Sequence, residues 1–387
     1  MKISMIGLGK LGLPCATVMS TRYAVTGYDL EAVQAPFPLT ESIEDCIESA
    51  DMIFVAVPTP HEERYGGDSP TSHLVPKDFD YSIVRAVLEE IAEYRTQSQT
   101  VILISTVLPG TVRREFAQII PDIVYNPYLI AVGTVAEDFV HPEMIMIGHE
   151  NNLPAVKKLQ QLYNNLTDWP PRYEIGSWED AESMKIFYNT FISTKIGLVN
   201  MILDVADKIG HMNVDHICGA LADSTMRIMG RKYMTPGMGD GGACHPRDNI
   251  ALRWLAKELD LGYDLFGAVM SAREAQAENM ARRLCVHGLP VVIMGQSYKK
   301  DIPNIDGSYS LLVGYYAEGM TDRVYYLDPL NDLNTVPDEP CVFLVSYHHE
   351  WVKEFDAYPP GSIIVDPWRS GMKVEGCRVI NVGSRTV

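Results

Sequence analysis

The sequence lacks an excess of basic residues, a paired cysteine pattern and any long apolar run, and each absence excludes a class of protein. It has 32 Lys and Arg against 50 Asp and Glu, a formal charge of −18. This balance argues against nucleic acid or an anionic membrane as partner, because clustered cations hold both. No apolar run approaches the roughly 20 residues of a membrane-spanning helix. The 7 cysteines show no C-x-x-C spacing, so we predict a reduced, cytoplasmic protein without a bound metal.

The patterning of the chain predicts its domain organisation. Its 387 residues, 47% of them hydrophobic, are enough for two or three domains with sizeable cores. Apolar runs and helical patterns alternate over about residues 1–170, a helical period follows, and the alternation returns after residue 288. We therefore predict an α/β protein of two Rossmann-like doubly wound lobes (1–173 and 276–387), joined by a long-helix central region (174–275) that offers a dimer face. Strands are expected at 2–6, 24–28, 52–57, 101–105, 123–125, 144–147, 290–295, 323–328, 341–346 and 362–366.

A glycine-rich turn near the N-terminus predicts a dinucleotide site. Gly7, Gly9 and Gly12 form a Gly-x-Gly-x-x-Gly motif after the first expected strand, and Asp29 ends the second strand 17 residues after Gly12. Small residues let the backbone approach a pyrophosphate at a helix N-terminus, and the acid binds the ribose hydroxyls. A carboxylate there repels a 2′-phosphate, so NAD is predicted over NADP. With the loops after two further strands, the predicted cofactor site is Gly7, Gly9, Lys10, Leu11, Gly12, Asp29, Pro58, Thr59, Ser105 and Thr106.

A second glycine-dense stretch, residues 237–248, surrounds a cysteine. Cys244 is followed four positions later by Asp248. Glycines at this density serve a close approach of the backbone to a ligand, and a thiol among them is exposed to that ligand. The plainer interpretation is a structural loop with a buried thiol, as for most free cysteines.

Two donors precede this loop on an expected helix. Lys185 and Asn189 are spaced i and i+4, so they lie on one helix face and can both donate to an oxygen that develops negative charge. For the pair alone, a solvated lysine and a surface asparagine are the plainer interpretation. The acids Glu179, Asp180 and Glu182 of the same segment are predicted to form a solvated face or to charge the helix N-terminus.

A thiol beside a nicotinamide has a specific chemical logic. An alcohol is oxidised to an aldehyde, a thiolate traps the aldehyde as a thiohemiacetal, and a second oxidation gives a thioester that water hydrolyses to an acid. The chain offers Cys244 as the nucleophile, Lys185 with Asn189 as the oxyanion donors, and Asp248 as the group near water.

Taken in order, these residues resemble the UDP-glucose/GDP-mannose dehydrogenase family over nearly the full chain. The matching segments are Gly7–Gly12 with Asp29, Val57–Pro60, Ser105–Thr111, Asn126-Pro127, Lys185 with Asn189, Gly239–Asp248, and Gly295 through Lys299-Lys300-Asp301 to Ser308. The resemblance implies two Rossmann-like lobes, a dimer formed by the helical middle, NAD in the first lobe and a nucleotide sugar against the second. It also implies oxidation of the C6 alcohol of a UDP-glucose-like sugar to a uronic acid through Cys244.

The resemblance also implies roles for single residues. Thr106 is expected near the nicotinamide and the sugar, Lys185 and Asn189 at the oxyanion, and Asp248 at the water. Lys299 is expected to reach the nucleotide or sugar, and Arg227 to serve the neighbouring substrate across a dimer. The predicted substrate site is Asn126, Tyr128, Lys185, Asn189, Arg227, Gly241, Gly242 and Lys299.

The sequence departs from the family pattern at several of these positions. Tyr128 and Val132 stand where the family commonly has glutamates, and the first of those acids is usually assigned to proton transfer or thioester hydrolysis. The stretch from Asp29 to Ala50 is shorter than usual. Further departures are Asp240 and His245 in place of aromatic residues, Arg247 in place of Lys, and Asp306 in place of Arg. Together they predict a divergent member whose sugar is not simply glucose.

Two alternatives to this four-electron dehydrogenase stay open. A one-step β-hydroxyacid-type dehydrogenase shares the dinucleotide lobe and the Lys-x-x-x-Asn pair but needs no thiol. A nucleotide-sugar-binding protein without activity is the second alternative, because the two glutamates are missing.

Overall fold

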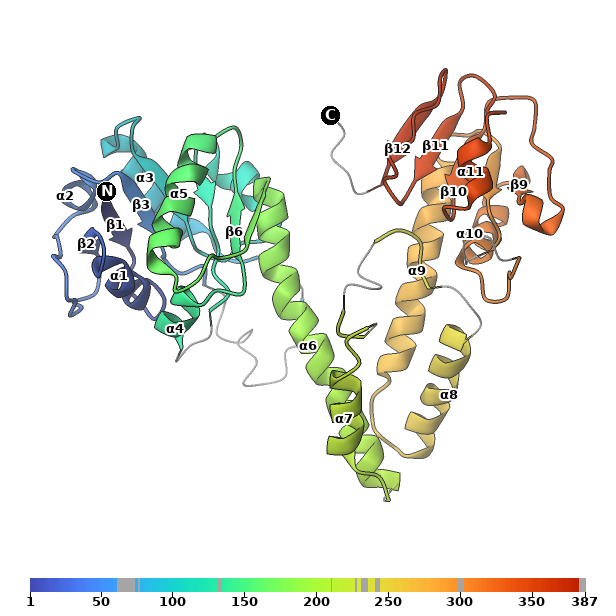
Figure 1. The fold of residues 1–387 in the computed structure, drawn as a ribbon, viewed down its shortest axis with the longest axis horizontal. Coiled ribbons are helices and arrows are strands. Elements are labelled where there is room, and N and C mark those ends of the chain that lie inside the picture. The colour runs from blue at the N-terminus through green and yellow to red at the C-terminus, as the bar shows by residue number, and fades with distance from the viewer. Residues whose placement is uncertain are drawn as a thin grey trace. The chain divides into compact units, whose positions relative to one another are not determined.

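The computed structural model describes residues 1–60, 74–75, 77–130, 134–209, 211–226, 228–230, 236–240, 244–297 and 303–382. The chain divides into two compact units, Met1–Ile196 and Gly197–Val387. Each unit contains its own β-sheet (Figure 1). Among the described residues, no helix combines the length and the apolarity that crossing a bilayer requires.

The sheet of the first unit has, within the described residues, seven strands in the order β2-β1-β3-β4-β5-β6-β7. Neighbours pair in parallel except β5 and β6, which pair in an antiparallel sense through Tyr125 and Gly148. Side chains of β3, β4 and β6 are buried throughout, as expected for strands covered on both faces. The strands are β1 (Lys2–Ile6), β2 (Ala24–Tyr28), β3 (Met52–Val55), β4 (Thr100–Leu103), β5 (Val124–Tyr125), β6 (Ile145–Gly148) and β7 (Tyr173–Gly176).

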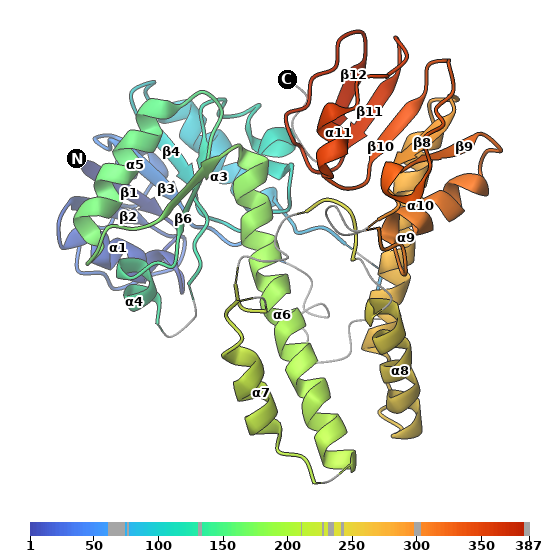
Figure 2. The ribbon, with the colours of Figure 1, turned by 45° about the vertical axis from the view of Figure 1, so that its right-hand side comes forward.

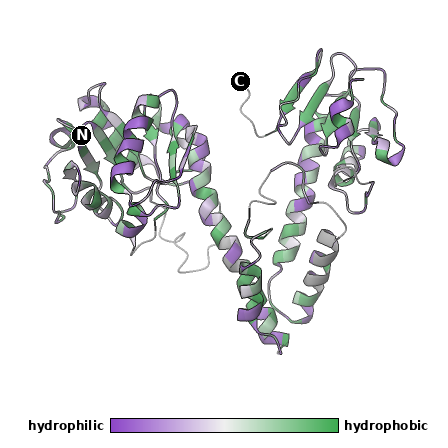
Figure 3. Cartoon of the chain, in the orientation of Figure 1, coloured by the Kyte–Doolittle hydropathy of each residue, from purple (hydrophilic) through white to green (hydrophobic). Residues whose placement is uncertain are grey.

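Helices cover both faces of this sheet, and the hydrophobic core lies in two layers (Figures 1 and 3). One layer packs under α1 (Gly12–Ser20), α4 (Val135–Val140) and α5 (Leu153–Leu166). The other packs under α2 (Ile43–Ile47), α3 (Ser82–Tyr94), the short π-helical turn η2 (Val112–Phe116) and the start of α6. In α3 the buried residues Val84, Leu88 and Ile91 recur at the helical spacing that the sequence shows.

The edge of the sheet beyond β2 reflects the short stretch after Asp29. Here Leu39 makes a single parallel bridge to Gly27, with hydrogen bonds from Gly27 N to Pro38 O (2.9 Å) and from Thr40 N to Gly27 O (3.0 Å). In the doubly wound order 3-2-1-4-5-6 a full strand occupies this edge. At this edge the chain after Asp29 thus forms one bridge in place of a strand.

Four helices follow. They are α6 (Trp178–Ile209), α7 (Val214–Ala222), α8 (Cys244–Glu258) and α9 (Leu265–Cys285). Side-chain oxygens of Asn213 and Asp264 accept the backbone N–H groups of His216 and Gly267 and so cap the N-termini of α7 and α9. The central helical region of the prediction thus corresponds to helices, whereas its boundaries at 173 and 275 stay a prediction.

The sheet of the second unit is parallel throughout, with the order β12-β11-β10-β8-β9 among the described residues (Figure 2). The strand order reverses between β8 and β10, the place where open α/β sheets bind ligands. The elements are β8 (Val291–Met294), α10 (Tyr309–Glu318), β9 (Val324–Leu327), the 3-10 turn η3 (Pro329–Asn331), β10 (Val342–Val345), α11 (Glu350–Glu354), β11 (Ile363–Asp366) and β12 (Arg378–Asn381).

The predicted fold class is confirmed: both units are doubly wound α/β structures. Three details differ from expectation. Strand β7 lies where the helical middle was expected to begin, and strand β12 lies outside all the expected strands. The pairing of β5 with β6 makes the first sheet mixed rather than purely parallel.

Candidate functional site

The three glycines of the N-terminal turn have three different environments. Gly7 has φ +92°, and a Cβ there would lie 2.8 Å from the Ala56 carbonyl. A Cβ on Gly12 would lie 1.9 Å from Gly7 O, so this position permits no side chain. Around Gly9, apart from its chain neighbours, no atom of the described residues lies within 4 Å of an added Cβ. Packing inside the protein explains Gly7 and Gly12, whereas the open surface at Gly9 fits the close approach of a pyrophosphate.

Asp29 is tied to the same turn. Its Oδ2 accepts a hydrogen bond from Leu8 N (2.5 Å), and its Oδ1 accepts one from Glu31 N (2.9 Å). The half-buried carboxylate thus fixes the turn after β1 from the end of β2. Lys10 is exposed, Leu11 is half-buried, and α1 begins at Gly12 with no side-chain cap at its N-terminus. A helix end without a side-chain cap suits an anion.

The loops after β3 and β4 are joined to each other. Thr59 Oγ1 donates to Thr106 O (2.8 Å), and the buried Ser105 Oγ donates to Val57 O (2.5 Å). Pro58 is exposed between them. These four predicted cofactor residues therefore lie at the carboxyl edge of the sheet that carries the glycine turn, where α/β proteins bind nucleotides.

Helix α6 brings Lys185 to this edge. Its Nζ donates to the main-chain oxygen of Tyr128 (2.7 Å), in the loop after β5. Burial lowers the pKa of the Lys185 ammonium. Asn189 lies one turn further along the same face and is exposed. The helix thus places a partly dehydrated donor beside the loops of the predicted cofactor site.

The prediction of a solvated acidic face is wrong for Glu182. Its side chain is fully buried and accepts hydrogen bonds from Gly110 N (2.5 Å) and Val112 N (2.7 Å) at the start of η2. Burial raises the pKa of Glu182, and these two hydrogen bonds oppose the shift. Glu179, in contrast, is half-buried and forms an ion pair with the exposed Arg113. Glu182 therefore anchors α6 to the loop that carries Thr106.

Asn126 and Tyr128, both predicted to bind substrate, have buried side chains. Asn126 Nδ2 donates to Met146 O (2.7 Å), and its Oδ1 accepts from the hydroxyl of Tyr163. The hydroxyls of Tyr128 and Tyr163 share a hydrogen bond of 3.1 Å. Burial raises the pKa of Tyr128 well above its usual value, so its phenol stays protonated at neutral pH. The tyrosine in place of the family's glutamate points into the core, and its main-chain oxygen is what reaches Lys185.

The glycine-dense loop is described up to Asp240. A Cβ on Gly237 would lie 2.4 Å from the Trp368 ring, and one on Gly239 would lie 2.1 Å from the Tyr309 ring. Asp240 pairs with Arg273 (2.5 Å), whose guanidinium lies 5.4 Å from the centre of the Tyr309 ring. These two glycines are therefore explained by aromatic packing within the second unit.

Several predicted site residues lie outside the described part of the chain. These are Arg227, Gly241, Gly242 and Lys299, together with Val132. For Cys244 and Asp248 only the backbone is described, and Cys244 is the first residue of α8. Their predicted roles stay predictions.

The strand-order reversal of the second sheet holds a small cavity of about 40 Å³, lined by both polar and aromatic residues. The buried Ser346 lines it, and its Oγ has no hydrogen-bond partner among the described residues. Asp328, the counterpart of Asp29, is fully buried and accepts from Gln296 N (2.8 Å) and Ser297 N (3.1 Å). Asn331 Nδ2 also donates to it (2.9 Å). The Asp328 carboxylate is therefore hydrogen-bonded to residues of the second unit itself. The remaining lining residues are Met238, Gly239, Asp240, Ser297, Ser308, Tyr309, Ser310, Tyr347 and Trp368.

Two doubly wound α/β sheets, the first with a dinucleotide turn, define a Rossmann-type dinucleotide-binding protein with a second α/β lobe. Residues 30–167 match the NAD binding domain of the UDP-glucose/GDP-mannose dehydrogenase family, and residues 179–274 match its central domain. These segments make up more than half of the chain, which therefore belongs to this family. The predicted resemblance and the predicted cofactor NAD are confirmed.

Relatives with known activities are distant. The chain is 24% identical over 290 residues to a UDP-glucose 6-dehydrogenase of Rickettsia felis, an alignment that covers 72% of this chain and 61% of that enzyme. It is 25% identical over 370 residues to a GDP-mannose 6-dehydrogenase of Pseudomonas putida, covering 85% and 80%. A crystal structure of a ternary complex of GDP-mannose dehydrogenase from Pseudomonas aeruginosa is similar in fold, with a TM-score of 0.83, 20% identity and coverage of 98% and 99%. The chain is a divergent member of its family.

Sequence reasoning missed two residues of this site, Glu182 and Tyr163. Glu182 precedes Lys185 by three positions and so shares its helix face, which is a signal that the spacing contains. Tyr163 carries no such signal, because it reaches Asn126 and Tyr128 only through the packing of α5 on the sheet.

Proposed function

We propose that the protein is an NAD-dependent nucleotide-sugar 6-dehydrogenase that oxidises the C6 alcohol of a UDP- or GDP-hexose to the uronate. The observation that carries the proposal is the position of Lys185. Helix α6 presents this partly dehydrated donor at the sheet edge that holds the dinucleotide turn. A donor at that place stabilises an oxyanion that forms where hydride leaves the substrate.

The chemistry follows the two-stage logic of a thiol enzyme. NAD, when bound, accepts one hydride in each stage. Cys244 adds to the aldehyde carbon to give a thiohemiacetal, and the second hydride transfer leaves a thioester on the sulfur. Water releases the acid and restores the thiol, with Lys185 and Asn189 at the oxyanion and Asp248 at the water. Overall, one alcohol, two NAD⁺ and one water give one carboxylate, two NADH and three protons.

The position of Cys244 supports this assignment. It opens the fifteen-residue helix α8, and the N-terminus of a helix favours an anion such as a thiolate.

In the second unit, the crevice between β8 and β10 is proposed to hold the nucleotide of the substrate. Ser346 offers it a buried hydroxyl, and Tyr347 and Trp368 offer it aromatic surface.

The proposal is tested by incubating the protein with NAD and a panel of UDP- and GDP-sugars. We expect NADH and a uronate in a ratio of two to one for at least one sugar. A ratio of one, with an aldehyde as product, shows that the chain with Tyr128 in place of a glutamate stops after the first stage. Absence of NADH with every sugar, while NAD and sugar nucleotide both bind, contradicts the proposed activity.

A matched pair of cysteine variants separates this activity from one-step hydroxyacid oxidation. Cys244→Ala removes the proposed nucleophile, so uronate formation is expected to stop. Cys218→Ala, in a half-buried free cysteine of α7, serves as the control. Full turnover by Cys244→Ala would favour the one-step reaction.

We further propose that the protein is a homodimer that buries one face of α6. Phe187, Phe191 and Leu198 lie on one face of this helix and are 65%, 53% and 45% exposed. Apolar side chains repeated along one long helix are typical of a subunit interface. Sedimentation equilibrium is expected to give twice the chain mass for the wild type and a lower mass for Phe191→Glu. A wild-type monomer at micromolar concentration would contradict the dimer.

A further inference from the structure

Three polar side chains form a connected group inside the first unit, between α5 and the loop after β5. Tyr163 of α5 is 2% exposed, Asn126 is fully buried, and Tyr128 is 8% exposed. The Tyr163 hydroxyl donates to Asn126 Oδ1 and lies 3.1 Å from the Tyr128 hydroxyl. The Tyr128 ring packs edge-on against Phe139 with centroids 5.4 Å apart. One hydroxyl from α5 thus contacts two residues of the loop after β5.

This group fixes the loop because its other polar atoms are also paired. Asn126 N donates to Leu103 O (2.8 Å), and Asn126 Nδ2 donates to Met146 O (2.7 Å). An unpaired amide or hydroxyl in such a dry place destabilises the fold, so each bond restricts the positions that the loop can take. Burial raises the pKa of both phenols, which keeps them neutral near pH 7.

The loop after β5 restricts the position of Lys185 through a main-chain atom. Tyr128 O accepts the Lys185 ammonium at 2.7 Å. An ammonium on a four-carbon stem has several rotamers, and a fixed acceptor selects one of them. The position of the carbonyl therefore sets the position of the charged nitrogen.

We propose that Tyr163 is a positioning residue for Lys185: it holds Asn126 and Tyr128 so that the Tyr128 carbonyl directs the ammonium toward the reaction site. Tyr128 serves the site through its main chain and not through its phenol. The catalytic consequence rests on the function proposed above, whereas the link between Tyr163 and Lys185 is independent of it.

The first test compares Tyr163→Phe with a matched control. Tyr173→Phe removes another tyrosine hydroxyl that contacts α5. Its oxygen lies 3.1 Å from Gln160 O and 2.9 Å from Asn164 Oδ1, and neither contact involves the loop after β5. We expect Tyr163→Phe to lower kcat about 10-fold with KM for NAD and sugar nucleotide within about 2-fold, and Tyr173→Phe to keep both values. Equal kcat values for Tyr163→Phe and wild type would overturn the proposal.

A second variant separates the phenol of Tyr128 from its carbonyl. Tyr128→Phe removes only the 3.1 Å bond and leaves Tyr163 donating to Asn126. We expect kcat to fall by less than about 3-fold, because the main-chain oxygen that Lys185 contacts remains. Loss of turnover in folded Tyr128→Phe would show that the phenol itself takes part, which overturns the main-chain assignment.

A third measurement needs no turnover. The rate at which an amine-reactive acyl ester modifies Lys185 is followed by peptide mass spectrometry, with the exposed Lys157 as internal reference. We expect the Lys185-to-Lys157 rate ratio to rise at least about 3-fold in Tyr163→Phe and to stay unchanged in Tyr173→Phe, because a released ammonium is more accessible. An unchanged ratio in Tyr163→Phe would overturn the link. If wild type oxidises no sugar while the ratio responds as expected, the proposed function fails and the positioning role stands.

Discussion

Removal of the Glu182 carboxylate tests whether α6 is anchored to the loop of Thr106. In Glu182→Ala, the N–H groups of Gly110 and Val112 lose acceptors at 2.5 and 2.7 Å. A buried donor without a partner destabilises the fold by about 1–3 kcal/mol. Part of this is offset, because the raised pKa of Glu182 shows that burial disfavours its charge. We expect the free energy of unfolding to fall by about 2–4 kcal/mol.

The control for this change is on the same helix. Glu179→Ala removes a half-buried carboxylate paired with the exposed Arg113, and such surface pairs contribute about 0–1 kcal/mol. Urea unfolding followed by far-UV circular dichroism compares the variants. Amide hydrogen exchange of the peptide around Val112 is expected to accelerate in Glu182→Ala alone. If Glu182→Ala destabilises no more than Glu179→Ala and leaves this peptide protected, the anchoring role is refuted.

Two further predictions concern the dinucleotide turn and a surface histidine. Gly9→Ala is expected to keep the urea midpoint and to weaken NAD binding about 10-fold or more in calorimetry, because its Cβ meets open space where a pyrophosphate approaches. Gly12→Ala is expected to destabilise the fold, since its Cβ would lie 1.9 Å from Gly7 O. Wild-type NAD affinity in Gly9→Ala would contradict the assignment of Gly9 to the pyrophosphate. Desolvation lowers the pKa of His141, but hydrogen bonds with Asp168 and Glu137 outweigh it and raise the net value. A histidine whose pKa is higher in the folded state than in the unfolded state stabilises the folded protein. This contribution is fully present below the unfolded pKa of about 6.5 and is lost as the pH rises through the folded pKa. We therefore expect the urea midpoint of the wild type to exceed that of His141→Gln most near pH 6, and the difference to shrink toward pH 8. A difference that stays constant with pH would contradict this prediction.

Most strands of both sheets could be predicted because buried parallel strands are short and mainly apolar runs. Lys2–Ile6, Met52–Val55 and Val342–Val345 agree with the predicted strands to within a few residues. Strand β7 was missed because Tyr173–Gly176 has a glutamate and is only partly buried. The antiparallel pairing of β5 was missed because strand direction depends on the path of the chain between strands, which periodicity does not contain.

The candidate site could be predicted in its residues but less well in their environments. The glycine motif predicted the turn, yet only the structure separates Gly9, which is open, from Gly12, which is enclosed. Glu182 was assigned to a solvated face because an acid on a helix usually is solvated. Its partners are main-chain N–H groups about 70 residues earlier in the chain. Because nearly every residue type carries such a group, the sequence does not indicate which ones Glu182 contacts.

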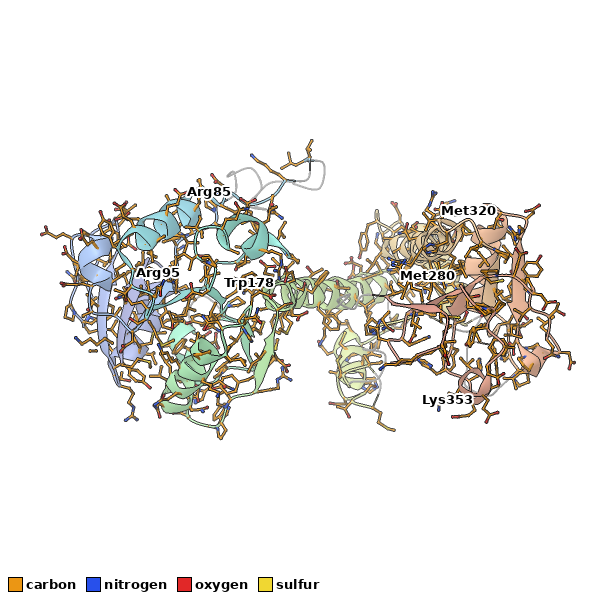
Figure 4. All side chains as sticks on the ribbon, turned by 90° about the horizontal axis from the view of Figure 1, so that it is seen from above. Arg85, Arg95, Trp178, Met280, Met320 and Lys353 are labelled. Atoms are coloured by element: carbon orange, nitrogen blue, oxygen red, sulfur yellow. The ribbon has the colours of Figure 1, made fainter. Side chains whose placement is uncertain are left out.

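One face of α6 explains how the site tolerates divergence at position 128. Trp178, Glu182 and Lys185 recur at helical spacing, and each forms a hydrogen bond with a main-chain atom of a loop in the first unit. For Trp178, which Figure 4 labels, Nε1 donates to Ile123 O (2.9 Å). Because Lys185 contacts the carbonyl of residue 128, replacement of a glutamate by tyrosine leaves that contact available. What the replacement removes is a carboxylate, the group that the family resemblance assigns to proton transfer or thioester hydrolysis. Divergence here therefore separates the two halves of the proposed reaction: the oxyanion donor is retained, and the ratio of NADH to uronate reports whether Asp248 alone supports the release of the acid.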